Sequence, residues 1–149
     1  MLWSIINRDD LYPDVLVSVR GPVDLLGRRE EKEVIKVVNW HMPTSISPMG
    51  YAISVRSDDA MSRIIAASRN FVVNFMGHDQ KSIVLSAENQ DGVFTDLFEY
   101  LGVSRALSER VESPRIREAR AFLECEVEQE LESGDHTIFI SRVVGSGRY

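Results

Sequence analysis

The segment VIKVVNWHMPTSISPMGYAISV, residues 34–55, has the pattern of a strand, a polar loop and a second strand. Its first five residues are mostly β-branched, which favours a pleated, half-buried strand, and its last five alternate larger apolar side chains with small ones. Between them, Pro43 and Pro48 lack backbone donors and flank residues 44–47, so we expect a shaped loop there rather than a strand.

A loop of this composition would place backbone N–H groups and hydroxyls beside the indole ring of Trp40. That combination suits a flat, anionic ligand, because the ring can stack on the ligand while the donors bind its negative charge. The alternative is a proline-stiffened hairpin connection that binds no ligand. The pattern by itself leaves both interpretations open.

Three motifs, in the same order along the chain, resemble those of the flavin reductase-like family, whose fold is the FMN-binding split barrel. In the first, NWHMPTSISP, the family's Trp-x-x-Pro-x-Ser-x-x-Pro pattern falls on Trp40, Pro43, Ser45 and Pro48. The second is FVVNF at residues 71–75, and the third is GDHTIFISRVV at residues 134–144. The resemblance covers residues 12–144 and implies an antiparallel split β-barrel with a few short helices.

Residue patterns along the whole chain independently predict a mainly β fold. Strands are expected at residues 14–20, 34–38, 51–55, 71–75, 121–130 and 136–144. Helices are expected at residues 60–68, 82–85 and 92–100. We expect Ser57 or Asp58 to cap the first helix, and charged connections at residues 25–32 and 108–115. Few helices and no β-α-β alternation favour an antiparallel barrel, and no linker divides the chain, so we expect a single domain over residues 1–149.

Composition disfavours several classes of function. The chain has 149 residues and a formal net charge of −6, which argues against a nucleic acid or an anionic membrane as binding partner. It contains no apolar run of the roughly 20 residues that cross a membrane and no signal-like N-terminus, so we expect a cytoplasmic protein. Cys125, the single cysteine, lies in an alternating strand, where we expect a buried, inert thiol.

Metal and hydrolase chemistry also lack a motif in this sequence. There is no cysteine cluster, and metal-ligand spacing is absent among the histidines, which are His41, His78 and His136. The chain has no GxSxG, no Walker A motif and no dinucleotide-binding glycine pattern. We therefore expect no resident metal and no catalytic side chain, since hydride transfer to a flavin needs no acid or base from the protein.

The family resemblance implies that the segment after the first strand of the motif binds FMN. Main-chain N–H groups would face the edge of the flavin ring, on Asn39, Trp40, His41 and Met42. The indole of Trp40 would wall the ring, and His136 would donate a hydrogen bond near the flavin and the nicotinamide. The alternatives are a core aromatic for Trp40 and a solvent-facing strand end for His136. Two places that are often polar in the family hold Val34 and Val37 here.

The flavin phosphate is the part of the ligand that this sequence matches least well. Hydroxyl groups would hold its oxygens, on Thr44, Ser45, Ser57 and Ser62. Arg56 is the expected cation, with Arg63 as the alternative. Asp58 and Asp59 would repel a dianion unless they point to solvent, and Asp59 stands where the family often has a basic residue.

These inferences predict an FMN-binding flavoprotein that transfers hydride from NAD(P)H to flavin, as an NAD(P)H:flavin oxidoreductase. The reduced flavin would serve an electron-acceptor protein such as a monooxygenase, or ferric iron. Two alternatives stay open, an electron carrier of the flavoredoxin kind that does not use nicotinamide, and a flavin-free binding module. The resemblance also implies a homodimer, with Phe71, Val73 and Ile138 on strands near the interface.

Overall fold

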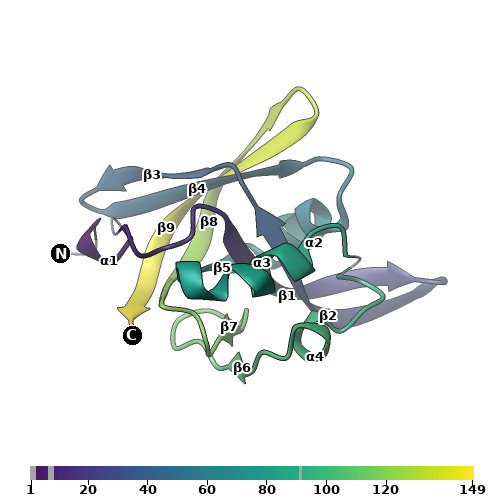
Figure 1. Ribbon diagram of the computed structural model, residues 1–149. Coiled ribbons are helices and arrows are strands. Elements are labelled where there is room, and N and C mark those ends of the chain that lie inside the picture. Colours follow the sequence, from purple (N-terminus) through teal and green to yellow (C-terminus); the bar gives the residue numbers. More distant parts are fainter. Residues whose placement is uncertain (1–2, 7–8, 91) are drawn as a thin grey trace.

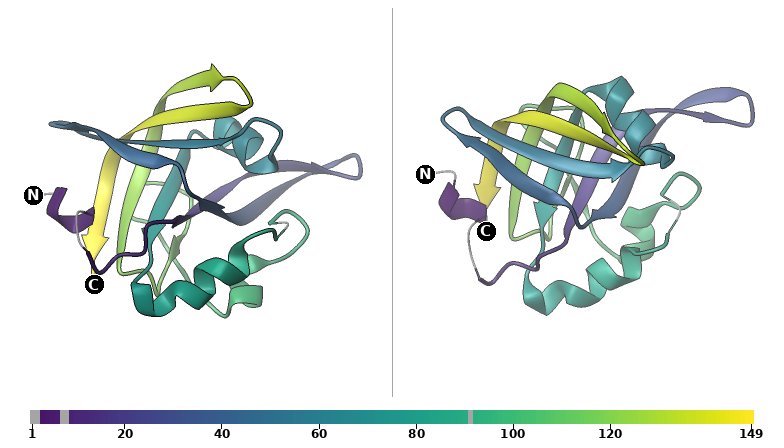
Figure 2. Two further views of the ribbon diagram at one scale, coloured as in Figure 1. Left: turned by 45° about the horizontal axis from the view of Figure 1, so that its top comes forward. Right: turned by 90° about the horizontal axis from the view of Figure 1, so that it is seen from above.

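The computed structural model describes residues 3–6, 9–90 and 92–149, and an antiparallel sheet of seven strands organises it (Figure 1). The strands in order across the sheet are β2 (Arg28–Val38), β1 (Val15–Leu25), β5 (Asn70–Phe75), β8 (Ala121–Ser133), β9 (His136–Arg148), β4 (Met49–Arg56) and β3 (His41–Ile46). The outermost strands, β2 and β3, are consecutive in the chain and are separated only by Asn39 and Trp40. The sheet therefore curls round on itself, as the two views of Figure 2 show, and the predicted fold class is confirmed.

Helices are short and lie around the barrel. Helix α2 (Ala60–Ser68) packs on β1 and adds its apolar face to the barrel interior. The outer side of β1 and β2 is covered by α3 (Lys81–Ala87), α4 (Leu97–Leu101) and the paired strands β6 (Arg105–Ala106) and β7 (Arg115–Ile116), below the sheet in Figure 1. The remaining elements are α1 (Trp3–Ile6) and the 3-10 helix η1 (His78–Gln80). Within the described ranges, no helix is long and apolar enough to cross a membrane.

Two apolar cores lie on opposite faces of β1, which explains why its residues 15–19 are all buried. The inner core fills the barrel, with side chains that include Val17, Ile53, Phe71, Val73, Leu123 and Phe139. The outer core lies under α3 and α4, with side chains that include Leu16, Ile35, Met76, Val84, Leu97 and Phe98. Cys125 is fully buried in the inner core, and burial raises the pKa of its thiol to about 12, so the prediction of a buried thiol is confirmed.

The segment predicted as a loop between Pro43 and Pro48 is mostly strand. Residues 44–46 continue β3, and the register shift between Pro43 and Ser45 is an irregularity of the bulge type. An edge strand with a bulge accommodates proline, because no ladder bond is needed from the missing N–H group. Only Ser47 and Pro48 turn the chain back into β4, so the prediction of a shaped loop is wrong here.

The charged connection predicted at residues 25–32 is also strand for most of its length. Strands β1 and β2 form one long hairpin, paired from Val15 opposite Val38 to Leu25 opposite Arg28. The turn consists of Leu26 and Gly27 alone, and both have positive φ, as a two-residue hairpin turn of type I′ requires. The charged side chains of this segment are exposed along the hairpin rather than on a loop.

Helix α2 has the predicted bounds, but its cap differs from the prediction. The N-cap is Asp59, whose carboxylate accepts the N–H of Met61 at 2.9 Å, and not Ser57 or Asp58. An N-cap side chain satisfies a backbone donor that has no partner inside the helix. The capping carboxylate therefore lies at the start of α2, beside the end of β4.

The helix predicted at residues 92–100 is shorter than expected. It begins only at Leu97, because the side chain of Asp96 caps it there. Gly102 ends it in the left-handed conformation, with φ of 68°, as its position in the sequence predicts. The apolar pattern before Asp96 belongs to the connection between α3 and α4.

Gly21 sets the distance between α2 and β1. A Cβ atom at this position would lie 2.7 Å from Cγ2 of Ile64 and 3.2 Å from the Ile64 carbonyl oxygen. Because a helix backbone cannot yield as a flexible side chain does, we expect Gly21→Ala to lower the free energy of unfolding by about 1–3 kcal/mol. Urea denaturation measures the change. Glu31→Ala, at an exposed position of the same hairpin, is the control, and equal stability of the two variants would contradict close packing at Gly21.

Candidate functional site

A cavity of about 430 Å³ opens beside the junction of β2 and β3, at the end of β4. We call it the Trp40 cavity, and the residues that line it are Lys36, Val37, Val38, Asn39, Trp40, Ser54, Val55, Arg56, Asp59 and His136. A smaller cavity of about 320 Å³ shares Lys36, Val37 and Asn39 with it and reaches the end of α3. Both volumes are in the range of roughly 300–1,000 Å³ that is usual for small-molecule sites.

A pair of stacked rings forms the aromatic wall of the Trp40 cavity. The ring centroids of Trp40 and His136 lie 4.5 Å apart, with an angle of 27° between the planes. His136 begins β9 opposite Arg56 of β4, which brings its ring to the junction. Trp40 keeps 62% of its surface exposed, so it is not the core aromatic of the alternative interpretation. An exposed indole held by a stacked partner offers a flat surface to a planar ligand.

Ion pairs surround the open side of the cavity. Nε of Arg56 lies 3.1 Å from Oδ1 of Asp58, and Nη1 lies 3.8 Å from Oδ2 of Asp135. Nδ1 of His136 lies 2.7 Å from Oδ1 of Asp135. The hydrogen bond from Arg56 lowers the pKa of Asp58, and the hydrogen bond from His136 lowers the pKa of Asp135. Both carboxylates are therefore charged at neutral pH, and both lie next to the guanidinium of Arg56.

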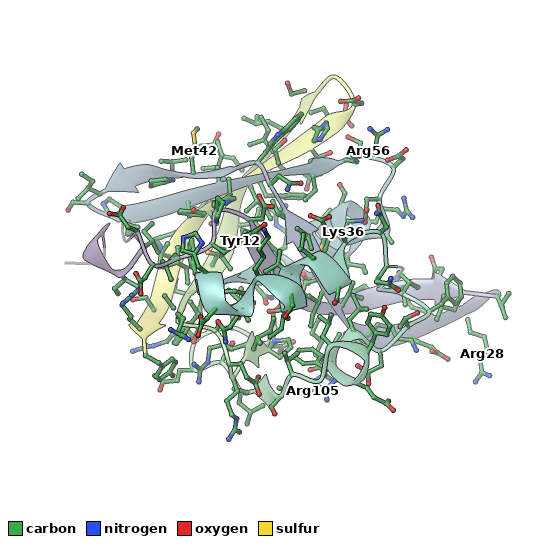
Figure 3. All side chains as sticks on the ribbon, in the orientation of Figure 1. Tyr12, Arg28, Lys36, Met42, Arg56 and Arg105 are labelled. Carbon is green, nitrogen blue, oxygen red and sulfur yellow. The ribbon has the colours of Figure 1, made fainter. Side chains whose placement is uncertain are left out.

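Lys36 of β2 supplies a second cation to the lining of the cavity. It alternates with Val34 and Val38, whose side chains belong to the inner core, so Lys36 extends from the same face of β2. Its Nζ lies 2.6 Å from Oδ2 of Asp59, the N-cap of α2. Figure 3 shows Lys36 and Arg56 at the same end of the barrel, near the start of α2.

The structure brings together part of the predicted ligand-binding set. Asn39, Trp40, Arg56 and His136 all line the Trp40 cavity. The remaining predicted residues of β3 do not, because the strand leads away from the junction, and these are His41, Met42, Thr44 and Ser45. Figure 3 shows Met42 projecting from β3 on the side away from Lys36.

The predicted phosphate hydroxyls beyond β4 also lie outside the lining of the cavity. The hydroxyl of Ser57 lies 2.9 Å from that of Thr137, and each can serve as the other's partner. Ser62 is buried within α2. These positions follow from the start of α2 at Ala60, which turns Ser62 toward the packed side of the helix.

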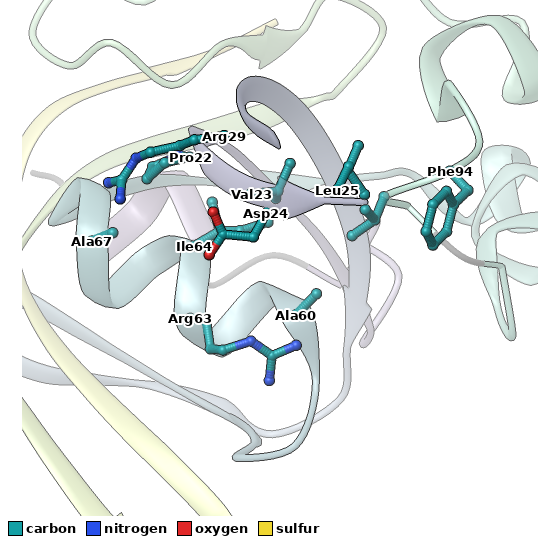
Figure 4. A pocket seen from close by; sticks show the side chains of 11 residues that line it. Pro22, Val23, Asp24, Leu25, Arg29, Ala60, Arg63, Ile64, Ala67 and Phe94 are labelled. Carbon is teal, nitrogen blue, oxygen red and sulfur yellow. The ribbon is translucent and has the colours of Figure 1, made fainter. Parts of the chain in front are cut away.

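A separate groove of about 390 Å³ lies between α2 and the hairpin of β1 and β2 (Figure 4). Arg63, the alternative cation, lines this groove together with Asp24 and Arg29. Ala60 also lines the groove, whereas the preceding residue, Asp59, lines the Trp40 cavity. The start of α2 therefore separates the two spaces, and Arg63 is not among the residues around Trp40.

The sequence patterns do not single out Lys36, Ser54 or Val55 as cavity residues. One signal was available for Lys36, which interrupts an otherwise β-branched run at residues 34–38. A charged residue inside such a run needs a partner or solvent where the strand packs, and Asp59 is that partner. Among the described residues, no group of three or more His, Cys, Asp or Glu side chains could hold a metal ion.

The side chain of His41 ties β3 to the segment before β1. Its Nδ1 lies 2.6 Å from the hydroxyl of Tyr51, and its Nε2 lies 2.7 Å from the carbonyl oxygen of Pro13. A carbonyl can only accept, so we assign the proton to Nε2, and Nδ1 accepts from Tyr51. Burial lowers the pKa of His41, against the raising effects of the Pro13 carbonyl and the charge of Asp14.

The chain is similar in sequence and in fold to known flavin enzymes. The sequence profile of the Flavin reductase like domain matches residues 15–147. The NADH-dependent flavin reductase StyB of Pseudomonas fluorescens is 32% identical over 134 residues, which covers 89% of this chain and 74% of that protein. An uncharacterized protein of Archaeoglobus fulgidus is 29% identical over 114 residues, and the match spans 76% of this chain but only 64% of the relative. The NADH:FAD oxidoreductase SgcE6 of Streptomyces globisporus C-1027 has a TM-score of 0.79 and 25% identity, covering 99% of this chain and 81% of that one.

His41 should make stability depend on pH in a defined direction. Its pKa in the folded protein is below the ordinary value of 6.5, so the unfolded chain binds more protons as the pH falls past 6.5. The contribution of the neutral ring is therefore complete above that pH and is lost below it. Between about pH 7 and pH 5, we expect the free energy of unfolding to fall by up to about 1.4 kcal/mol per pH unit more in the wild type than in His41→Gln.

Urea denaturation across this pH range measures the difference between the two proteins. Above the pKa of the unfolded histidine, the free energies of unfolding of the two proteins differ only by the cost of the hydrogen bonds that the variant loses. This constant difference is the internal reference. Parallel pH profiles for wild type and variant would show that His41 is not held neutral by its surroundings.

Proposed function

The chain belongs to the flavin reductase-like family, and we propose from this that it binds a flavin in the Trp40 cavity and acts as an NAD(P)H-dependent flavin reductase. When bound, the flavin supplies the chemistry, since it accepts a hydride from NAD(P)H, which leaves as NAD(P)⁺, and gives the electrons to an acceptor. The residues of the chain bind and orient the ring and exclude water from it. No side chain is assigned the role of acid or base.

The observation that carries the proposal is the exposed, stacked indole of Trp40 at the edge of an apolar cavity. Val37 and Val55 line the same space, so a planar ring placed against the indole would exchange water for apolar contacts. Asn39 and Ser54 add polar groups, which suit the nitrogen and oxygen atoms along one edge of a flavin. These residues therefore fit the ring of the proposed ligand.

FMN is the flavin that we propose, held within a single domain. The Trp40 cavity and the smaller cavity share Lys36, Val37 and Asn39 in their linings, so we place the ribityl chain on the side of the ring that faces the smaller cavity. The alternative is FAD, which the name of SgcE6 includes. Mass spectrometry of the flavin released from purified protein distinguishes the two, and FAD alone would contradict the choice of FMN.

The electron acceptor that we propose is a partner enzyme such as a monooxygenase, or ferric iron.

We also propose a symmetric homodimer that pairs through the outer face of β3, β4 and β9. Met42 lies opposite Ala52, and Ala52 lies opposite Ile140, so these three side chains share one face of the sheet. Ile138 lies two residues along the same strand and shares that face, while Phe139 between them points into the inner core. An apolar sheet face of this kind is stabilised when a second copy covers it.

Only one of the side chains predicted near the interface lies on this outer face. That residue is Ile138, which is partly exposed on β9. Phe71 and Val73 are fully buried in the inner core and cannot contact a second copy. Both side chains point into the barrel, so the interface that we propose does not include them.

Titration with FMN followed by an assay of NADH oxidation tests the function. We expect saturable quenching of flavin fluorescence, and oxidation of NADH only when flavin is present. Flavin binding without NADH oxidation would favour the electron carrier of the flavoredoxin kind. Absence of flavin binding would contradict the proposal and favour the flavin-free module.

Trp40→Ala tests the placement of the ring. We expect about two- to tenfold weaker FMN binding, because an aromatic stacking contact contributes about 0.5–1.5 kcal/mol. Ile46→Ala is the matched control, since Ile46 is an exposed apolar residue of β3 that does not line the cavity. If Trp40→Ala binds FMN as tightly as the control, the ring lies elsewhere.

Met42→Glu tests the proposed dimer. A charge placed in an apolar interface has to be desolvated, so we expect the variant to be monomeric at micromolar concentration, where the wild type is dimeric. Sedimentation or light scattering measures the mass. Leu107→Glu, at a position that is 86% exposed between β6 and β7, is the control and should leave the dimer intact. A monomeric wild type with flavin bound would contradict the proposal.

A further inference from the structure

The Lys and Arg side chains that line the Trp40 cavity both have carboxylate partners from the chain itself. Nζ of Lys36 lies 2.6 Å from Oδ2 of Asp59. Nε of Arg56 lies 3.1 Å from Oδ1 of Asp58, and Nη1 lies 3.8 Å from Oδ2 of Asp135. A phosphate that enters the cavity would therefore meet cations whose charge is already balanced.

Asp59 also takes the position at which the start of α2 would favour an anion. Helix starts attract negative charge, because their first backbone N–H groups have no partner inside the helix. Oδ1 of Asp59 accepts the N–H of Met61 at 2.9 Å, while Oδ2 faces Lys36. One carboxylate of the chain thus binds both the backbone donor and the ammonium group that a phosphate could otherwise use.

We infer that the Trp40 cavity selects flavins by their ring and not by their phosphate, so that riboflavin and FMN bind with similar affinity. This inference rests on the proposed flavin site. To reach Lys36, the phosphate of FMN would have to displace Asp59, and the freed carboxylate would then repel a group that carries about −1.5 to −2 charges. The apolar walls and the indole of Trp40 contact only the ring, which both flavins share.

Titration of the wild-type protein with riboflavin and with FMN, followed by flavin fluorescence, compares the two affinities directly. We expect dissociation constants within about threefold of each other. FMN binding that is more than about tenfold tighter would overturn the inference and leave the proposed function intact. If neither flavin binds, the proposed function itself is overturned.

Asp59→Asn separates the charge of this side chain from its role at the start of α2. Asparagine caps helices about as well as aspartate does, so the helix should keep its N-terminus. With Lys36 released from its partner, FMN should bind about tenfold tighter, as expected for one charge-assisted hydrogen bond, while the affinity for riboflavin stays unchanged. Unchanged FMN affinity in this variant would overturn the inference.

The matched control repeats the substitution in a Lys36→Met background. Asp59→Asn should then bring no gain in FMN affinity, because the cation that it would release is absent. The two substitutions are therefore expected to be coupled rather than additive. Equal gains in both backgrounds would overturn the assignment of Lys36 as the cation that Asp59 withholds from the phosphate.

Discussion

The short connection between β2 and β3 is the constraint on which the rest of the structure depends. Only Asn39 and Trp40 separate the two outermost strands of the sheet, so these strands cannot lie far apart. A hydrogen bond of 2.9 Å from the Ser54 N–H to the Trp40 carbonyl fixes the junction against β4. The sheet must therefore close. Asn39 and Trp40 belong to neither strand and lie at the opening, where the Trp40 cavity forms.

The same closure determines how charge is distributed around the cavity. Lys36 emerges from the core-facing side of β2, and α2 starts directly after β4, so Asp59 meets Lys36 at the opening. Asp58 and Asp135 accompany Arg56 in the same way. From the sequence, Asp58 and Asp59 are expected to repel an anionic ligand. In the structure they form ion pairs with Arg56 and Lys36. What remains for a ligand is an aromatic and apolar surface, which suits a ring better than a phosphate.

Local patterns predicted the elements that depend on local residues. The β-branched run at 34–38 and the apolar spacing at 60–68 gave a strand and a helix, because the side chains that form them are neighbours in the chain. The strand over residues 44–46 was missed, since its bulge forms only against β4. Lys36 was missed for a similar reason, because its partner Asp59 is brought to it by the folding of the barrel. The candidate site is therefore predictable where it follows the motif around Trp40, and not where it depends on packing.

The central claim is that a flavin ring binds against Trp40 at the opening of the barrel. A crystal structure of the protein with bound FMN tests it most directly. We expect the ring in contact with Trp40, Val37 and Val55, and the phosphate toward solvent with the ion pair of Lys36 and Asp59 intact. A ring bound instead in the groove between α2 and the hairpin of β1 and β2 would contradict binding against Trp40.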